Sequence, residues 1–442
     1  MRLEIEKLRG WVNPADAFLA MHSKDTNAFW LDRSTNQDEP VSIIGSAGKV
    51  IRAGDEAFAL ASEHLGSINQ ALVSLPEDEI PFSFRPGLVG YLGFELADED
   101  HEGIHPKAQF MIVDRAMIFD HSTKSMYFIG IFQTRDEFVN WFRAALLRLA
   151  LVGGELASYK QNTKPPRLVS SKLRHTKENY LELIQKAKDH IQSGDVFQLC
   201  LTNQIFIKHE ADALKTFLTL RELNPAPYGG YLKIGGVEIV SSSPEQFLKV
   251  SAEGKVSSKP IKGTRPRNID PSEDARIANE LLNNEKERAE NLMIVDLMRN
   301  DLGRVCDADS IVVEKLFEIE SYATVHQLVS TVTGRLKSGL SATSALAACF
   351  PGGSMTGAPK IKAVEILRKL ESAPRDIYSG AFGYLGFDGS ADFGMTIRTL
   401  VFEGDSATLG IGGGITIDSD PNGEFEETML KSKALLRALG GE

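Results

Sequence analysis

The chain has 442 residues, of which 42% are hydrophobic and 25% are charged, and this is the balance of an ordinary globular protein. Its formal net charge of −11, with no basic stripe to offset it, argues against nucleic acid as a partner. The sequence contains no long uncharged apolar run and no secretory signal, so we expect a cytoplasmic protein that does not enter the membrane.

The first 154 residues have a mixed α/β pattern in which no set of catalytic side chains stands out. Residues 111–120 and 125–132 are rich in β-branched and aromatic side chains, which predicts strands. Residues 136–153 have the spacing of an amphipathic helix. The stretch 155–174 is polar and basic and contains two consecutive prolines, which predicts a linker or a long surface connection. We therefore predict an N-terminal domain at 1–154, a linker at 155–174 and a C-terminal domain at 175–442.

A short internal similarity links the two parts. Residues 87–95, GLVGYLGFE, resemble residues 380–388, GAFGYLGFD, with glycine and aromatic residues at matched positions. The match predicts two related strand-and-turn units, although chance or a common strand pattern also explains so short a similarity.

The C-terminal part combines predicted helices with clustered strands. Thr176 is placed to cap a helix that ends near Gly194. Because the strands cluster and few strand-helix-strand alternations occur, the pattern favours an α+β layered fold. Further helices are predicted at 274–302 and 424–439, and strands at 196–207, 237–247, 380–387, 393–402 and 407–415.

Two pairs of glutamates have the spacing of a metal site. Glu287 and Glu290 are three residues apart on one predicted helix, and Glu424 and Glu427 repeat this spacing on another, with Lys431 one turn further on. Carboxylates from two helices can converge on Mg²⁺, which keeps several waters and takes oxygen from a substrate. Solvated glutamates on helix surfaces are the alternative interpretation.

Two glycine-rich segments could bring backbone close to a ligand. Residues 350–360, FPGGSMTGAPK, lie between apolar helical segments and could offer N–H groups to an anion. The segment fails the phosphate-loop pattern because Ala358 and Pro359 separate Gly357 from Lys360. Residues 410–415, GIGGGI, lack the fingerprint of a dinucleotide site.

Lys262 lies in a cationic segment, KPIKGTRPR, with Arg265 and Arg267 close by in the sequence. A surface loop with scattered cations is one interpretation. The other is a nucleophilic lysine, because nearby positive charge and partial burial would both lower the pKa of its amine.

Five motifs in order resemble those of the chorismate-utilising enzymes, whose members include anthranilate synthase component I, aminodeoxychorismate synthase component I, isochorismate synthase and salicylate synthase. The resemblance is highly specific, covers essentially all of 175–442 and extends more weakly to residues 87–96. It implies an α+β layered core of two large antiparallel sheets flanked by helices. The motifs are PIKGTRPR, AENLMIVDLMRNDLGR, PGGSMTGAPK, TIRTL and GIGGGI.

The resemblance also implies roles for individual residues. The Mg²⁺ ligands of the family fall on Glu290 and Glu427, with Glu287 and Glu424 beside them, and its acid/base glutamate falls on Glu245. The dianion chorismate would be compensated by the metal ion and by nearby cations. The implied substrate-binding residues are Gly263, Thr264, Thr356, Gly357, Tyr384, Arg398, Gly412, Gly413, Gly414 and Lys431.

Two positions separate the family members. Relatives that add water carry a lysine base at the position of Gln198, and a glutamine cannot deprotonate water. Anthranilate synthases have alanine at the position of Lys262. Aminodeoxychorismate synthases have lysine there, as this chain does. The resemblance therefore implies amination at C4, toward p-aminobenzoate and folate, with Lys262 first attacking C2. Amination at C2, as in anthranilate synthase component I, is the alternative.

Other implied features are less direct. Gln327 stands where anthranilate synthases have a histidine, and the neighbouring His326 is a weak substitute. A tryptophan pocket would fall near Ser23, Pro227 and Tyr228. Because no glutaminase motif is present, the resemblance implies a separate glutamine amidotransferase subunit that supplies ammonia, and the chain alone should use ammonium.

Overall fold

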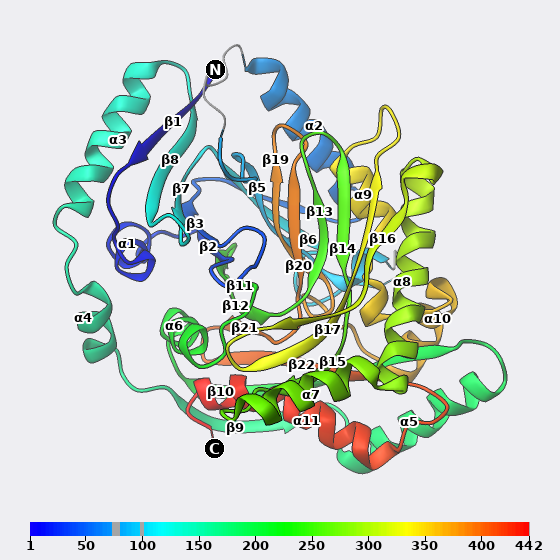
Figure 1. The fold of residues 1–442 in the computed structure, drawn as a ribbon. Helices are drawn as coiled ribbons and strands as arrows, with labels where there is room; N and C mark the ends of the chain where they lie inside the picture. Colours follow the sequence, from blue (N-terminus) through cyan, green and yellow to red (C-terminus); the bar gives the residue numbers. More distant parts are fainter. Residues whose placement is uncertain (73–79, 98–100, 442) are drawn as a thin grey trace.

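The computed structural model describes residues 1–72, 80–97 and 101–441 as two large antiparallel sheets packed face to face, with helices outside (Figure 1). This confirms the predicted α+β layered architecture. Within the described residues the first sheet, sheet A, has twelve strands and the second, sheet B, has ten. In spatial order, sheet A contains β1 (Arg2–Leu8), β8 (Ser125–Phe132), β7 (Arg115–Asp120), β3 (Val41–Ser46), β2 (Ala28–Asp32), β11 (Tyr228–Ile234), β12 (Val237–Ser243), β21 (Thr399–Glu403), β22 (Ser406–Ile415), β10 (Gln198–Glu210) and β18 (Gly357–Ala358), with β9 (Arg167–Leu173) also pairing β10. Sheet B contains β15 (Ile261–Pro266), β17 (Val325–Arg335), β14 (Lys255–Lys259), β13 (Gln246–Val250), β20 (Ala391–Met395), β19 (Ala381–Gly386), β5 (Gly87–Leu92), β6 (Ala108–Val113) and β4 (Val50–Ala53), with β16 (Val312–Ser321) also pairing β17.

Helices cover the outer faces of both sheets. Helices α5, α10 and α11 pack against β10 or β22, and α8 packs against β15 and β17. Thr176 caps α5 as predicted, because its hydroxyl accepts a hydrogen bond from the Asn179 N–H at 3.4 Å. The helices are α1 (Pro14–Met21), α2 (Ala57–Ala71), α3 (Arg135–Leu149), α4 (Glu155–Asn162), α5 (Lys177–Gln192), α6 (Ala213–Leu223), α7 (Pro271–Asn283), α8 (Glu285–Val305), α9 (Ala342–Cys349), α10 (Lys360–Glu371) and α11 (Pro421–Ala438).

Strands from the N-terminal and C-terminal parts are continuous in both sheets. Strand β2 pairs with β11 in sheet A, and β5 pairs with β19 in sheet B. The two segments with similar sequences are therefore antiparallel neighbours, with Gly90 opposite Gly383. The predicted division into domains at 1–154 and 175–442 stays a prediction. Both hydrogen-bonded sheets contain strands from each side of that boundary. The predicted linker contains α4 and β9, both on the surface.

Three segments predicted as single strands each pass from one sheet to the other. The break lies at Asp114 between β6 and β7, at residues 244–245 between β12 and β13, and at residues 396–398 between β20 and β21. Residues on both sides of each break have strand-like composition, so the local pattern does not reveal the change of sheet. The second and third of these corners contain Glu245 and Arg398.

The predicted helix at 274–302 is two helices. Asn284 has extended backbone angles, and its side chain accepts a hydrogen bond from the Glu287 N–H at 3.1 Å. It therefore ends α7 and caps α8, which points α8 along the edge of sheet B.

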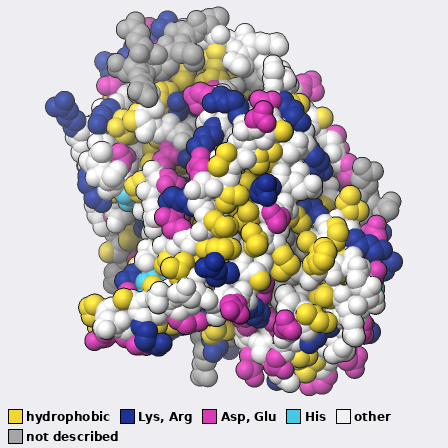
Figure 2. Space-filling model, turned by 45° about the vertical axis from the view of Figure 1, so that its right-hand side comes forward, with side chains coloured by type: hydrophobic (Ala, Val, Ile, Leu, Met, Phe, Trp, Pro, Cys, Tyr) yellow, Lys and Arg dark blue, Asp and Glu magenta, His cyan; other side chains and the backbone are white. Residues whose placement is uncertain are grey.

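Hydrophobic side chains from both sheets fill the space between them, including Phe29, Tyr91 and Phe382. None of the helices in the described part of the chain is long and apolar enough to span a membrane. On the face drawn in Figure 2, acidic and basic side chains are interspersed around hydrophobic side chains that gather near the middle.

Candidate active site

The candidate site lies where the chain crosses between the two sheets. Glu245 and Arg398 belong to adjacent corners, which are joined by hydrogen bonds of 3.0 Å from the Met395 N–H to the Glu245 carbonyl and from the Ser242 N–H to the Arg398 carbonyl. Arg398 has a φ of +51°, a conformation that non-glycine residues seldom adopt. Such corners direct side chains out of the regular sheet pattern, which brings residues from both sheets to one place.

Lys262 is directed into this region by a bulge in β15. The register between β15 and β17 shifts between Ile261 and Thr264, and Gly263 has a φ of +84°. The Lys262 ammonium donates to a Glu290 carboxylate oxygen on α8 at 3.2 Å. A Cβ atom at Gly414 would lie 2.9 Å from the Lys262 Nζ atom, so β22 passes directly against this lysine.

The neighbours of Lys262 differ from those predicted. Arg265 pairs with Glu280 and Glu287, and Arg267 pairs with Asp274, so both guanidiniums are neutralised by α7 and α8. Burial acts to lower the pKa of Lys262, but the carboxylate of Glu290 outweighs it and the pKa lies above its ordinary value. The expectation of a depressed pKa is therefore wrong.

The Gln198 side chain lies close to Lys262, beside Gly414, and its amide has no hydrogen-bond partner among the described residues. Both polar atoms of its side chain are buried and have no hydrogen-bond partner within the described residues. A Cβ atom at Gly414 would lie 2.6 Å from the Gln198 Nε2 atom. Because an unpaired buried amide costs free energy, this group is suited to hydrogen bonding with a bound molecule.

The four predicted metal-site glutamates lie on two helices, α8 and α11, that are linked through Lys286. The Lys286 ammonium lies 3.3 Å from a Glu424 oxygen on α11 and 3.9 Å from a Glu290 oxygen on α8. Burial raises the pKa of Glu287, and the neighbouring charges of Glu290 and Glu427 raise it further. A cation already stands between these carboxylates, and their mutual repulsion would be relieved by a divalent ion.

The carboxylates of Glu290 and Glu427 suit Mg²⁺ as a partial set of ligands. No three acidic, histidine or cysteine side chains in the described ranges are already grouped as a complete metal site. Mg²⁺ takes one or two carboxylates and completes its shell with water and substrate oxygens. Glu290 and Glu427 fit that role without a preformed cage.

Lys431 joins α11 to the glycines of β22. Its ammonium donates to the Gly412 carbonyl at 3.1 Å and pairs with Glu427 at 2.9 Å. Burial opposes ionisation of Glu427, but Lys431 holds the pKa of that carboxyl below its ordinary value. Gly412, Gly413 and Gly414 pair with Thr202, Leu201 and Cys200 of β10, so this backbone lies beside Gln198.

The glycine-rich segment 350–360 is tied to β10 next to Gln198. Gly357 pairs with Leu199, and the Thr356 carbonyl accepts from the Cys200 N–H at 2.7 Å. The N–H groups of Met355 and Thr356 donate to Gly352 and Gly353 within the segment, so neither is free for an anion as the sequence suggested.

A buried ion pair that the sequence analysis missed supports this segment. Arg375 forms two hydrogen bonds with Glu371, at 2.7 and 2.8 Å, and also donates to the carbonyls of Met355 and Cys200. It therefore clamps the glycine-rich segment to β10. Glu371 and Arg375 are four residues apart at the end of α10, and this spacing could have indicated an ion pair. The sequence did not show that the pair would be buried.

Glu245 is the acidic group of the site. It is 6% exposed, and burial raises its pKa to about 7, opposed by a hydrogen bond from Ser354 and by the charge of Lys262. A carboxylic acid that keeps its proton near neutral pH can donate it to a leaving group.

Arg398 and Tyr378 form another part of the site. The Arg398 guanidinium has no ion pair or hydrogen bond with any described residue, and burial lowers its pKa while Tyr378 and Glu427 oppose that shift. The Tyr378 ring lies on β22, since a Cβ atom at Gly410 would be 1.9 Å from it. Tyr378 was missed in the sequence, and the glycine at 410 is the signal that a ring approaches there.

Tyr384, His326 and Gln327 have other surroundings. Tyr384 is buried between the sheets with its ring 5.0 Å from Phe84. His326 is held by Asp274 at 2.9 Å and Ser321 at 2.8 Å, and so connects β17 to α7. Gln327 lies opposite Thr264 in the sheet.

The residues predicted for a tryptophan pocket do not share one cavity. Ser23 follows α1 and donates to the Leu19 carbonyl, whereas Pro227 and Tyr228 line a space of about 20 Å³ in another region. The Arg33 guanidinium covers the Tyr228 ring at 4.2 Å and donates to the Gly229 carbonyl at 3.2 Å. Arg33 is only 2% exposed, so the chain's own side chain occupies the face of the Tyr228 ring, where it lines a separate space of about 10 Å³.

The chain is similar to known chorismate-binding proteins in both sequence and structure. Residues 26–437 match the family model described as chorismate binding enzyme. The chain is 39% identical to an aminodeoxychorismate synthase of Streptomyces griseus over 96% of its length, and 41% identical to one of Streptomyces pristinaespiralis over 99%. It spans 62% and 65% of these relatives' own lengths. The crystal structure of anthranilate synthase component I from Streptococcus pneumoniae superimposes with a TM-score of 0.75 at 26% identity, covering 98% of this chain and 92% of that one.

Proposed function

Because the chain belongs to the chorismate binding enzyme family, we propose that it acts as an aminodeoxychorismate synthase component I. It would convert chorismate and ammonia into 4-amino-4-deoxychorismate, the precursor of p-aminobenzoate in folate biosynthesis. The observation that carries this proposal is Lys262, whose amine lies among Glu290, Gln198 and the glycines of β22. The names of the two Streptomyces relatives support the same activity.

The substrate would be held by cations and by an unpaired amide of the site. Chorismate has two carboxylates, and the chain offers the cation of Arg398 from the corner before β21 and that of Lys431 from α11. Glu290 and Glu427, with Glu287 and Glu424 beside them, would hold Mg²⁺, which when bound neutralises a substrate carboxylate. The Gln198 amide, which lacks a partner among the described residues, could orient a ring substituent or ammonia.

Two displacements would place nitrogen on C4. In the first, the Lys262 amine attacks C2, the two conjugated ring double bonds shift from C1=C2 and C5=C6 to C1=C6 and C4=C5, and the C4 hydroxyl leaves as water with a proton from Glu245. In the second, ammonia attacks C4, both double bonds return to C1=C2 and C5=C6, and the Lys262 nitrogen leaves C2 as the amine. The sum is chorismate and ammonia giving 4-amino-4-deoxychorismate and water. The first step requires the Lys262 amine to be released from its contact with Glu290.

The ammonia would come from a glutamine amidotransferase partner, and the isolated chain would use ammonium. The alternative, anthranilate synthase component I, is kept because the chain superimposes on a structure of that enzyme. The two activities differ in whether nitrogen enters at C4 or C2.

Product analysis with chorismate, Mg²⁺ and ammonium tests the proposal. We expect 4-amino-4-deoxychorismate, whereas anthranilate as the sole product would refute it. Lys262→Ala should lose C4 amination by about a thousandfold, while Lys255→Ala, at an exposed lysine of neighbouring β14, should keep it. With ammonia withheld, mass spectrometry should detect a substrate adduct on Lys262, and undiminished C4 amination by Lys262→Ala would remove this residue from the mechanism.

A further inference from the structure

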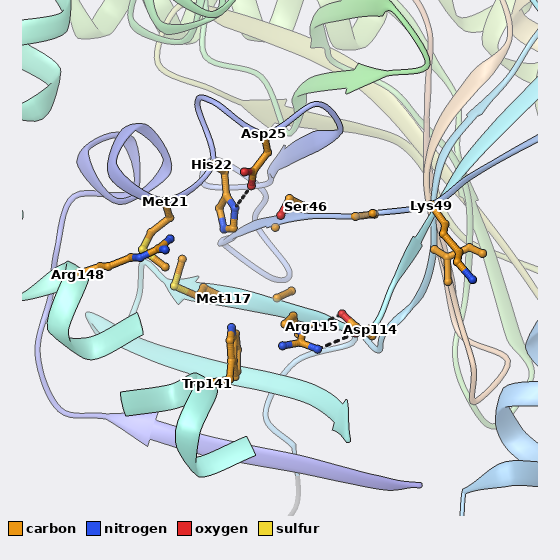
Figure 3. A pocket seen from close by; sticks show the side chains of 15 residues that line it. Met21, His22, Asp25, Ser46, Lys49, Asp114, Arg115, Met117, Trp141 and Arg148 are labelled. Carbon is orange, nitrogen blue, oxygen red and sulfur yellow. Dashed lines mark hydrogen bonds and ion pairs between the residues drawn. The ribbon is translucent and has the colours of Figure 1, made fainter. Parts of the chain in front are cut away.

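A cavity of about 550 Å³ lies in the N-terminal region, outside the candidate active site (Figure 3). Its walls come from the end of α1, the end of β3, the start of β7 and the inner side of α3. None of the residues assigned to the candidate active site lines it. A cavity of this size accommodates a small metabolite.

One wall of the cavity is a fixed aromatic surface. Trp141 on α3 points into the space (Figure 3). The rings of Phe128 and Phe132 pack against it with centroids 5.6 Å away, and the Arg115 guanidinium lies 5.7 Å from its centroid. Met21 and Met117 complete an apolar lining. A rigid indole beside flexible thioethers suits a planar ring, because the ring can stack without ordering a mobile partner.

Cations face the cavity from opposite sides. In Figure 3 Arg148 reaches in from α3 and Arg115 from β7. Arg115 is neutralised by Asp114 at 2.8 Å, whereas Arg148 forms no ion pair with any described residue and only adds, after the hydrogen bond from His22, to the lowering of the pKa of Asp25. A positive group free to pair is notable on a chain with a formal net charge of −11, and it would attract an anion locally.

Polar groups stand across the cavity from Trp141. His22 and Asp25 share a hydrogen bond of 3.0 Å, and Ser46 lies at the end of β3 (Figure 3). These groups can accept hydrogen bonds from an amino substituent on a ring. The cavity thus combines a stacking surface, a free cation and hydrogen-bond acceptors.

We propose that this cavity binds a small planar aromatic anion, which stacks on Trp141 and pairs its carboxylate or phosphate with Arg148. The proposal is independent of the activity assigned to Lys262. An aromatic carboxylate and a nucleotide share this chemistry, so the test must separate them.

Isothermal titration of the full chain with 4-aminobenzoate, folic acid and AMP tests the proposal, with benzylamine as a cation of similar shape. We expect at least one anion to bind, Arg148→Gln to weaken it about tenfold or more, and Lys262→Ala to change its affinity less than twofold. Trp141→Phe should bind more tightly than Trp141→Ala. Which anion binds identifies the ligand type.

Three outcomes would overturn the proposal. These are no binding of any of the three anions, equal binding of benzylamine, and binding that survives Arg148→Gln but is lost in Lys262→Ala. The last outcome would assign the anion to the candidate active site. Since Arg148 is exposed, Arg148→Gln should keep the wild-type melting temperature. Lys262→Ala should lose the proposed activity but keep anion binding, so failure of one proposal can be distinguished from failure of the other.

Discussion

The space around Lys262 and the space beside Tyr228 are both bordered by the two sheets, but they are completed in opposite ways. Around Lys262 the chain leaves the buried Gln198 amide without a hydrogen-bond partner, and the half-buried Arg398 guanidinium has no ion pair or hydrogen bond with any described residue. Beside Tyr228 the chain inserts its own guanidinium, and Arg33 lies between the Tyr228 ring and Asp392.

This difference between the two spaces indicates which of them is suited to bind a ligand. A polar group that is buried and unpaired costs free energy in the empty protein, and a bound molecule recovers that cost. Beside Tyr228, two Arg33 nitrogens and one Asp392 oxygen also lack hydrogen-bond partners among the described residues, but this cation and carboxylate face each other at 3.6 Å, so their charges offset one another within the protein. We therefore expect substitutions near Lys262 to affect activity, and substitution of Arg33 to affect stability and ligand access.

The largest effect should come from Glu245→Gln. Burial raises the pKa of Glu245 to about 7, so its acid form is present below that pH and is lost as the pH rises. If Glu245 protonates the leaving hydroxyl, the wild-type rate should fall tenfold per pH unit above about 7. Glu245→Gln should lower the rate about a thousandfold at pH 6 and remove this limb of the pH–rate profile. An unchanged profile in the variant would assign the titration to another group.

The next largest effect should come from Gly414→Ala. The new Cβ atom would lie 2.6 Å from Gln198 and 2.9 Å from Lys262, both at flexible side-chain ends, so the fold should adapt while the site is displaced. We expect activity to fall about a hundredfold with little change in melting temperature. Gly413→Ala is the control, because its nearest contact is 3.3 Å, at Glu424. Equal losses in the two variants would contradict the placement of β22 against Lys262.

A smaller effect is expected when Glu290 is changed to Gln. If Glu290 holds Mg²⁺, the Mg²⁺ concentration for half-maximal activity should rise about tenfold or more. Glu285→Gln, at an exposed position on the same helix, should leave it unchanged. Activity of Glu290→Gln that saturates at the wild-type Mg²⁺ concentration would argue against this ligand.

The smallest effect on activity should come from Arg33→Ser. We expect activity within about twofold of wild type and a lower melting temperature, since the change leaves Asp392 without its cation at a cost of about 1–3 kcal/mol. The variant should also bind L-tryptophan in isothermal titration, while wild type and the exposed control Arg9→Ser should not. Tight tryptophan binding by wild type would show that Arg33 does not close this space.

Much of the local structure follows from the sequence. Strand composition, helix periodicity and the Thr176 cap predicted several of the helices and strands and the α+β class, although the breaks between β12 and β13 and between α7 and α8 were not foreseen. The motif residues Lys262, Glu290 and Gly414 were identified from sequence, and they lie together. Their grouping could be anticipated because each motif is a short segment whose residue types resemble those of a known family.

Only the tertiary structure decided the surroundings of these residues. Whether Lys262 has cations or carboxylates as neighbours depends on α7 and α8 drawing away Arg265 and Arg267. Similarly, Tyr378 rather than Tyr384 lies beside Arg398, because the ring rests on β22 at a glycine far along the chain. Such contacts join segments that are distant in sequence, and local periodicity contains no information about them. The sequence by itself determined which chemical groups the chain offers, while the crossing of two continuous sheets decided which of them meet.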